Sequence, residues 1–160
     1  MNNFFELKNK VAIITGSSRG IGKGIAIRFS ELGAKIIVSS RKIDACERVV
    51  KEIVNCGGIA SAFECNISSK NACEGLINFA KEKYGKIDIL VCNAASNPYY
   101  GKLAEIPDES FDKIMNNNVK SNLWLCKKTV PFFKNNNSGS IINMGSVLGT
   151  TGGPSSPHYS

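Results

Sequence analysis

The sequence has no hydrophobic stretch long enough to cross a membrane, and residues 1–10 lack the apolar segment of a signal peptide. These absences predict a soluble, intracellular protein, which we expect in the cytoplasm with no membrane partner. Histidine occurs once and no two cysteines form a Cys-x-x-Cys pair, so no metal site is predicted. The six cysteines lie singly within predicted helices and strands, which favours reduced, structural thiols.

Acidic residues are scarcer than basic ones: 13 Asp and Glu against 20 Lys and Arg give a net charge of +7. The lysines are spread over several predicted helices without an aromatic platform, which disfavours a nucleic-acid partner. The positive charge is compatible with an anionic, phosphate-bearing ligand. A length of 160 residues with 42% hydrophobic residues suits one domain, which we assign to residues 1–160.

Strand-like and helix-like segments alternate along the chain, with no internal repeat. Strands are predicted over 10–15, 36–39, 60–65, 87–92 and 139–144, and helices over 20–32, 43–54, 69–83 and 108–131. Gly33 is expected to end the first helix, and Ser68 or Ser69 to cap the third. Single helices between strands imply right-handed βαβ units. The predicted fold class is therefore α/β, a Rossmann-like doubly wound parallel sheet with helices on both faces.

A glycine-spaced stretch, Thr15–Gly22, lies directly between the first predicted strand and the first predicted helix. In a dinucleotide site, Gly16 would allow a sharp turn, Gly20 a close approach of the cofactor, and Gly22 tight packing of helix on strand. The helix would offer unpaired N–H groups and a positive dipole end to a phosphate. We predict a dinucleotide site here; the alternative is an ordinary loop with flexible glycines.

The second strand is not followed by the carboxylate that usually holds the ribose 2′-OH of NAD. The chain reads Ser39–Lys42 there, with a hydroxyl, a guanidinium and an ammonium group. Arg41, with Arg19 from the glycine turn, would suit a 2′-phosphate, because a guanidinium grips phosphate in a fork. We therefore predict NADP(H) in preference to NAD(H). In the alternative interpretation, Arg41 and Lys42 are merely solvated.

Several ordered motifs resemble those of the short-chain dehydrogenase/reductase (SDR) family. They are the glycine turn 15–22, Cys92–Ala95 after the fourth strand, Asn118 in the long helix, Ile141–Ser146 at the fifth strand, and Tyr159 thirteen positions after Ser146. The resemblance implies catalytic roles for Asn118, Ser146 and Tyr159. It implies cofactor contacts from Gly16, Ser18, Arg19, Gly20, Ile21, Gly22, Ser40, Arg41, Asn66, Ile67, Asn93, Ala94 and Ala95.

The chain departs from the family pattern in three places. Cys92 and Ala95 replace an Asn and a Gly, changes that we expect to be tolerated. Asn66 replaces an Asp beside the adenine, and its amide oxygen is expected to accept from the adenine amino group. The family's Tyr-x-x-x-Lys motif needs a lysine four residues after Tyr159, and the sequence stops at Ser160. It looks like a partial chain, which we expect to be marginally stable and close to inactive alone.

The resemblance implies hydride transfer between nicotinamide and a carbonyl carbon. Tyr159 would give its phenolic proton to the developing alkoxide, and Ser146 would hydrogen-bond the same oxygen. The family lysine would lower the phenol pKa from its usual value of about 10, and Asn118 would hold a water that links this lysine to solvent.

The substrate class implied is a ketone or a secondary alcohol. The loop 97–101 resembles that of carbonyl-reductase and 3-oxoacyl-carrier-protein-reductase-like members. The resemblance also implies a homotetrameric or homodimeric parent, built partly through the helix 108–131. A non-catalytic nucleotide-binding or interaction module is the alternative function, if the short chain is the natural product. A Rossmann methyltransferase is disfavoured by the spacing of Ser146 and Tyr159.

Overall fold

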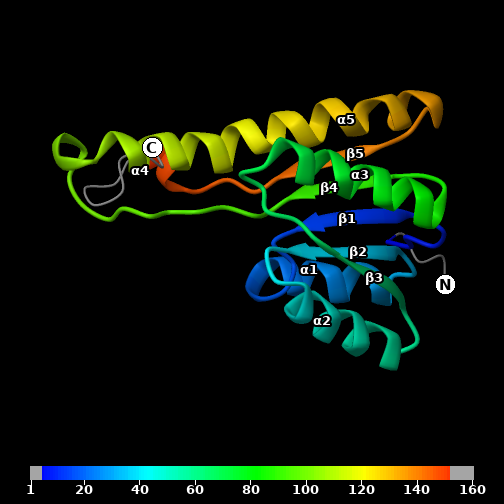
Figure 1. Cartoon of the computed structure of the whole chain (residues 1–160). Coiled ribbons are helices and arrows are strands. Elements are labelled where there is room, and N and C mark those ends of the chain that lie inside the picture. Colours follow the sequence, from blue (N-terminus) through cyan, green and yellow to red (C-terminus); the bar gives the residue numbers. More distant parts are fainter. Residues whose placement is uncertain (1–4, 152–160) are drawn as a thin grey trace.

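The computed structural model describes residues 5–151, which form one five-stranded sheet with helices packed against it (Figure 1). The strands are β1 (Val11–Thr15), β2 (Lys35–Ser40), β3 (Ile59–Glu64), β4 (Ile89–Cys92) and β5 (Ser140–Asn143). The principal helices are α1 (Gly20–Glu31), α2 (Ile43–Asn55), α3 (Lys70–Tyr84), α4 (Asp108–Ile114) and α5 (Ser121–Asn135). Within 5–151, no helix is long and apolar enough to span a bilayer.

The sheet is entirely parallel and has the strand order β3-β2-β1-β4-β5. The chain runs outward from β1 to β3, then crosses back so that β4 pairs with the other side of β1. This reversal is the topological switch point at which open α/β sheets bind nucleotides, outside the carboxyl ends of the strands. The predicted Rossmann-like fold class is confirmed.

Two helical layers cover the sheet, α1 and α2 on one face and α3 and α5 on the other (Figure 1). Because successive side chains of a strand point to opposite faces, β1 contributes Ile13 to one core, and Ala12 and Ile14 to the other. The first core joins Ile13 to side chains of α3 and α5, and the second joins its neighbours to α1 and α2. A strand buried on both faces needs the continuous apolar run seen in the sequence.

The long helix predicted over 108–131 differs from the structure in two ways. It is divided by a turn of π-helix, η2 (Met115–Lys120), between α4 and α5. It also continues to Asn135 with Pro131 inside α5. Proline removes one helical hydrogen bond, but its φ suits a helix. Since Pro131 is exposed, water can bind the carbonyl that loses its helical donor, so the helix does not have to end there.

Smaller differences concern the ends of elements. Ser69 caps α3 by accepting a hydrogen bond from the backbone N–H of Ala72 at 3.3 Å. Gly33 has φ +92° and follows the C-cap residue Leu32, so α1 ends one residue earlier than predicted. The predicted loop after β4 contains a short 3-10 turn, Leu103–Glu105, and a short helix α6 (Leu148–Thr151) follows β5.

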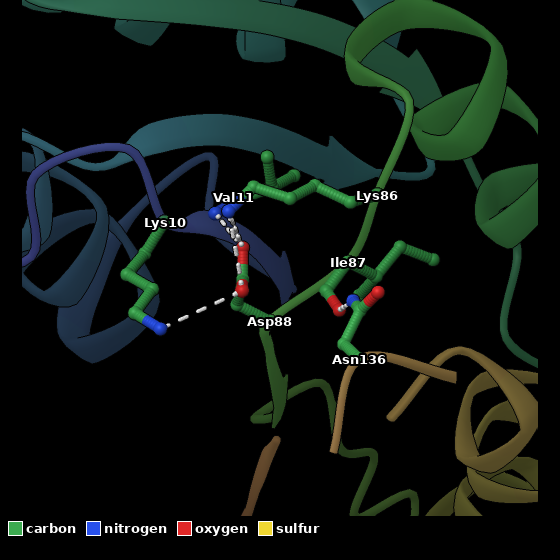
Figure 2. A network of polar contacts seen from close by, with 6 residues as sticks. All are labelled: Lys10, Val11, Lys86, Ile87, Asp88 and Asn136. Atoms are coloured by element: carbon green, nitrogen blue, oxygen red, sulfur yellow. Dashed lines mark hydrogen bonds and ion pairs between the residues drawn. The ribbon is translucent and has the colours of Figure 1, made fainter. Parts of the chain in front are cut away.

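A buried carboxylate joins the amino ends of β1 and β4 (Figure 2). Asp88 is 6% exposed and accepts a 2.8 Å hydrogen bond from the backbone N–H of Val11. The ammonium groups of Lys86, at 3.0 Å, and Lys10, at 3.7 Å, balance its charge. The backbone carbonyl of Asp88 also accepts from the N–H of Ser140 at the start of β5. One residue therefore links three strands at the edge opposite the switch point.

Candidate nucleotide site at the switch point

The glycine turn is tied to the end of β2 by Ser17, a fully buried residue. Its hydroxyl donates to the Ile14 carbonyl at 2.6 Å and accepts from the Ser39 N–H at 2.9 Å, while its own N–H donates to the Ser39 carbonyl. Neighbouring Ser18 is half-buried. The turn between β1 and α1 is therefore fixed in place by hydrogen bonds and is not a flexible loop.

The three glycines of the turn have different surroundings. Gly16 has φ +67°, and a Cβ there would lie 2.9 Å from the Cα of Ala94. A Cβ on Gly22 would lie 2.5 Å from the Asn93 side-chain nitrogen and 2.6 Å from the Gly16 carbonyl oxygen. Gly20 has φ +56° and faces open space, with no atom within 4 Å of a Cβ position. Two glycines thus permit close packing, and the third leaves room for a ligand.

The amino end of α1 is open. The N-cap residue Arg19 is extended, with φ −162°, and makes no side-chain capping hydrogen bond. Arg19 and Gly20 are exposed, and Ile21 is 67% exposed. A helix N-terminus without a side-chain cap leaves backbone N–H groups available to an anion, assisted by the helix dipole. The residues present therefore fit the diphosphate of a dinucleotide.

The segment after β2 holds the predicted 2′-phosphate residues. Arg41 is exposed, so its guanidinium is accessible to a ligand. The Ser40 hydroxyl is less available, because it donates to the Lys42 carbonyl at 3.3 Å and lies 3.1 Å from the Cys46 sulfur. Burial raises the pKa of the Cys46 thiol. The arrangement offers one exposed guanidinium and no carboxylate over residues 39–42.

The residues after β3 lie beside the same edge of the sheet. The Asn66 side-chain oxygen accepts two hydrogen bonds from Ser68, from its N–H at 3.2 Å and from its hydroxyl at 3.0 Å. The Asn66 oxygen was expected to accept from the adenine amino group, but its two lone pairs already bind Ser68 in a local turn. Ile67 is 8% exposed, and its side chain belongs to the core that contains residues of α3.

Thr15 organises the segment that follows β4. Its hydroxyl accepts from the backbone N–H groups of Asn93 and Ala94, both at 3.0 Å, and donates to the Val91 carbonyl at 3.3 Å. The Asn93 side chain donates to the Thr15 carbonyl at 2.8 Å. Sequence reasoning missed this role of Thr15, because its partners lie 78 and 79 positions away. Exposed Ala95 follows on the same segment.

Asn118 lies in the π-helical turn and binds the backbone of Ser96. Its side-chain oxygen accepts from the Ser96 N–H at 2.8 Å, and its nitrogen donates to the Ser96 carbonyl at 3.0 Å. The Asn118 carbonyl accepts from the Asn122 side chain at 2.9 Å. The adjacent Asn117 donates to the Ser96 hydroxyl at 2.9 Å, a contact that the sequence analysis missed. The predicted water-holding role of Asn118 stays a prediction.

Ser146 follows β5, the strand that pairs with β4. It is exposed, and its hydroxyl accepts from the Leu148 N–H at 3.2 Å, at the start of α6. Its catalytic role stays a prediction. Tyr159, its predicted partner, lies outside the described residues.

Buried thiols line the interior behind the site. All six cysteines lie within residues 5–151 and are free. Burial raises the pKa of Cys92, the residue before Asn93, to about 12. A hydrogen bond with Cys73, together with burial, raises the pKa of Cys65, and the same hydrogen bond lowers the pKa of Cys73 against the effect of burial. Cys92 and Cys65 are therefore protonated at neutral pH, and act as core residues rather than nucleophiles.

Comparison with known families gives a match along nearly the whole chain. The family model for short chain dehydrogenases matches residues 10–160. The chain belongs to this short-chain dehydrogenase family. The earlier resemblance, drawn from the glycine turn and the four downstream motifs, is confirmed.

Curated relatives of this chain occur in animals and plants. "Dehydrogenase/reductase SDR family member 4" of Mus musculus is 39% identical over 153 residues, covering 96% of this chain and 55% of the mouse protein. "Short-chain dehydrogenase/reductase SDRA" of Arabidopsis thaliana is 37% identical over 143 residues, covering 89% and 56%. The chain spans about half the length of the curated relatives it matches.

Solved structures of similar proteins include complexes with both nicotinamide cofactors. A 7α-hydroxysteroid dehydrogenase, complexed with NADH and 7-oxo glycochenodeoxycholic acid, is 36% identical, with a TM-score of 0.92 over 97% of this chain and 60% of that chain. A metagenomic short-chain oxidoreductase in complex with NADP is 31% identical, with a TM-score of 0.84 over 89% and 65%. Short-chain dehydrogenases that resemble this one therefore bind either NADH or NADP.

Proposed function

We propose that this chain is the cofactor-binding part of an NADP(H)-dependent oxidoreductase acting on a ketone or secondary alcohol. The observation that carries the proposal is the switch-point arrangement. Gly20 and the uncapped end of α1 leave room for a diphosphate, while Thr15 holds Asn93 and Ala94 beside them. We propose that the site belongs to a single domain spanning residues 1–160, located in the cytoplasm.

The proposed cofactor would be held by residues on both sides of the switch point. The α1 N-terminus would bind the diphosphate, Arg41 and Arg19 the 2′-phosphate, and the segment after β4 the nicotinamide half. When bound, the nicotinamide supplies or accepts the hydride. Ser146 would donate a hydrogen bond to the substrate oxygen. Tyr159 would transfer its phenolic proton to that oxygen as the carbonyl carbon gains the hydride.

The preference for NADP(H) is supported by the charges after β2. Ser39–Lys42 contains no carboxylate that could hold a ribose 2′-OH or repel a 2′-phosphate. Arg41 is exposed, and a guanidinium binds phosphate bidentately. Since one structural relative was solved with NADP and another with NADH, family membership leaves the preference open.

A titration with NADPH and NADH tests the proposal. We expect NADPH to bind at least about tenfold more tightly, the scale of one charge-assisted contact. Arg41→Ala should remove most of that preference and leave the NADH affinity unchanged. Arg48→Ala is the matched control, because Arg48 is an exposed arginine on α2 and is not one of the predicted site residues. Equal or tighter binding of NADH by the unmodified chain would contradict the preference.

A non-catalytic nucleotide-binding or interaction module is the second candidate function. It is favoured because the contacts that build the binding half of the site, from Thr15 and Ser17, do not involve Ser146. The coding sequence beyond Ser160 distinguishes the two. A continuing frame with lysine four residues after Tyr159 supports the oxidoreductase, whereas a stop codon supports the module.

We propose that the partner of the long helix is a second copy of this chain. Phe111, Met115, Val119 and Leu123 recur every four residues and are 41–55% exposed. Met115 and Val119 also line an open depression of about 630 Å³. Two copies packed antiparallel would place Phe111 against Leu123 and Met115 against Val119, so the stripe is self-complementary about a two-fold axis. Val119→Lys should convert the dimer or tetramer to a monomer in sedimentation experiments.

A further inference from the structure

A hydrogen bond between two side chains lies beside the site and belongs to none of the predicted roles. Asn117 is 7% exposed, and its nitrogen donates to the Ser96 hydroxyl at 2.9 Å. It lies in the π-helical turn η2, and such turns are frequent at functional sites. Asn118, the next residue, binds the backbone of Ser96 through both side-chain polar atoms. Consecutive residues of one turn therefore hold both the backbone and the side chain of Ser96.

The segment Asn93–Ser96 is fixed at its other end by β1. The Thr15 hydroxyl accepts the N–H groups of Asn93 and Ala94. Four residues are thus attached to the central strand at one end and to the π-helical turn at the other. The second attachment includes the hydrogen bond from Asn117 to the Ser96 hydroxyl, which holds the Ser96 side chain.

The strand order places this segment on the nicotinamide side. Arg41 and Asn66 follow β2 and β3, on one side of β1, whereas Ser146 follows β5 on the other side. A dinucleotide lying across the switch point would put its adenine half toward Arg41 and its reacting ring toward Ser146. Since β4 lies between β1 and β5, Asn93–Ser96 borders the reacting half.

We propose that Asn117 and Ser96 are positioning residues whose side-chain hydrogen bond fixes Asn93–Ser96 against the nicotinamide half of the cofactor. The inference rests on the proposed function. Asn118 contacts only the backbone of Ser96, so its contact does not depend on the Ser96 side chain, and it opens more often once the Asn117 bond is lost. The Asn117 amide is buried, so without the Ser96 hydroxyl its donor is left unpaired, and the segment loses one of its attachments.

Two variants and one matched control test the inference. Their binding of the complete cofactor is compared with their binding of its adenine half. Ser96→Ala and Asn117→Val each remove the hydrogen bond. Ser61→Ala is the control: it removes a part-buried 2.9 Å bond to the Tyr84 hydroxyl, between β3 and the far end of α3. Each protein is titrated with NADPH and with adenosine 2′,5′-bisphosphate, which carries only the adenine half. Both site variants should weaken NADPH binding about five- to tenfold and change the bisphosphate affinity less than about twofold.

Ser96→Thr keeps the hydroxyl and should restore NADPH binding. An equal loss for both ligands would show a merely structural role, and an unchanged NADPH affinity would show none; either result overturns the inference. The Ser61→Ala control should leave both affinities unchanged, and a loss of NADPH binding equal to that of Ser96→Ala would also overturn it.

Hydrogen exchange separates this inference from the proposed function. In the free protein, Asn117→Val should accelerate exchange of the Ser96 amide at least about fivefold, while the Asn93 and Ala94 amides stay protected by Thr15. If the unmodified chain binds no NADPH, the proposed function fails, and exchange at Ser96 still decides whether Asn117 fixes the segment. Unchanged exchange at Ser96 overturns that role even when NADPH binds.

Discussion

β1 and β5 each contain two consecutive isoleucines but have opposite surroundings. β1 lies between β2 and β4, and all five of its residues are buried. β5 pairs with β4 alone, and all four of its residues are exposed, with Ile141 and Ile142 at 37% and 38%. The glycine turn follows the buried strand, and Ser146 follows the exposed one. Within residues 5–151, the binding half of the site therefore has the firmer support.

Core truncation should give the largest contrast between the two strands. Ile13→Ala removes a fully buried side chain from β1 and should lower the free energy of unfolding by about 2–5 kcal/mol. Ile142→Ala removes an exposed side chain from β5 and should cost less than about 1 kcal/mol, because little buried area is lost. Urea denaturation of both variants measures the difference. Equal losses would show that β5 is covered in solution.

A methyl group added at the close contact behind the glycine turn should weaken both the packing of the turn and cofactor binding. Gly22→Ala would press a methyl group against Asn93 and Gly16. We expect a loss of about 1–3 kcal/mol of stability and at least a tenfold weaker NADPH affinity. Gly24→Ala is the control, since it points into open space on the same helix and should stabilise it by up to about 1 kcal/mol. Unchanged NADPH binding by Gly22→Ala would count against this location for the site.

The opposite edge of the sheet should affect stability without affecting binding. Asp88→Ala leaves the buried Val11 N–H without its acceptor and should cost about 1–3 kcal/mol in urea denaturation. Glu105→Ala, which breaks an exposed pair with Lys102, should change stability by less than about 1 kcal/mol. NADPH affinity of the folded Asp88 variant should match that of the unmodified chain. A weaker affinity would show that the two edges are coupled.

Cys92 should cause a loss of stability at alkaline pH. Its pKa is about 12 when folded against 9.0 for a free thiol, so the unfolded state loses its proton first. The stabilisation from this thiol is therefore complete below pH 9 and is lost as pH rises toward 12, with a slope of about 1.4 kcal/mol per pH unit. Urea denaturation between pH 8 and about 10.5 should show this slope, and Cys92→Ala should reduce it. Cys56→Ser, at an exposed thiol, should leave it unchanged.

Sequence reasoning succeeded where local pattern decides the structure. Buried strands such as β1 and β4 show as apolar runs, and the glycine turn is readable because a positive φ at Gly16 and Gly20 requires glycine. The parallel direction of the strands followed from the single helices between them.

Long-range polar contacts could not be predicted in the same way. Thr15 contacts Asn93 and Ala94 across 78 and 79 positions, and nothing local marks its hydroxyl as their acceptor. The Asn117–Ser96 bond depends on a π-helical turn, which has no distinctive sequence pattern here. Pro131 misled the prediction because proline usually ends a helix, and its exposure is a tertiary property.

The strand order also has a kinetic consequence. β1 can pair with β2 soon after synthesis. Its other neighbour, β4, is made later, because Asp88 lies 77 positions after its partner Val11. At about 5–20 residues per second, translation leaves that side of β1 unpaired for roughly 4–15 s. Insertion of β4 closes a long loop, a slow step in parallel sheets. The crossover that creates the switch point thus sets the period in which we expect the nascent chain to be most prone to aggregation.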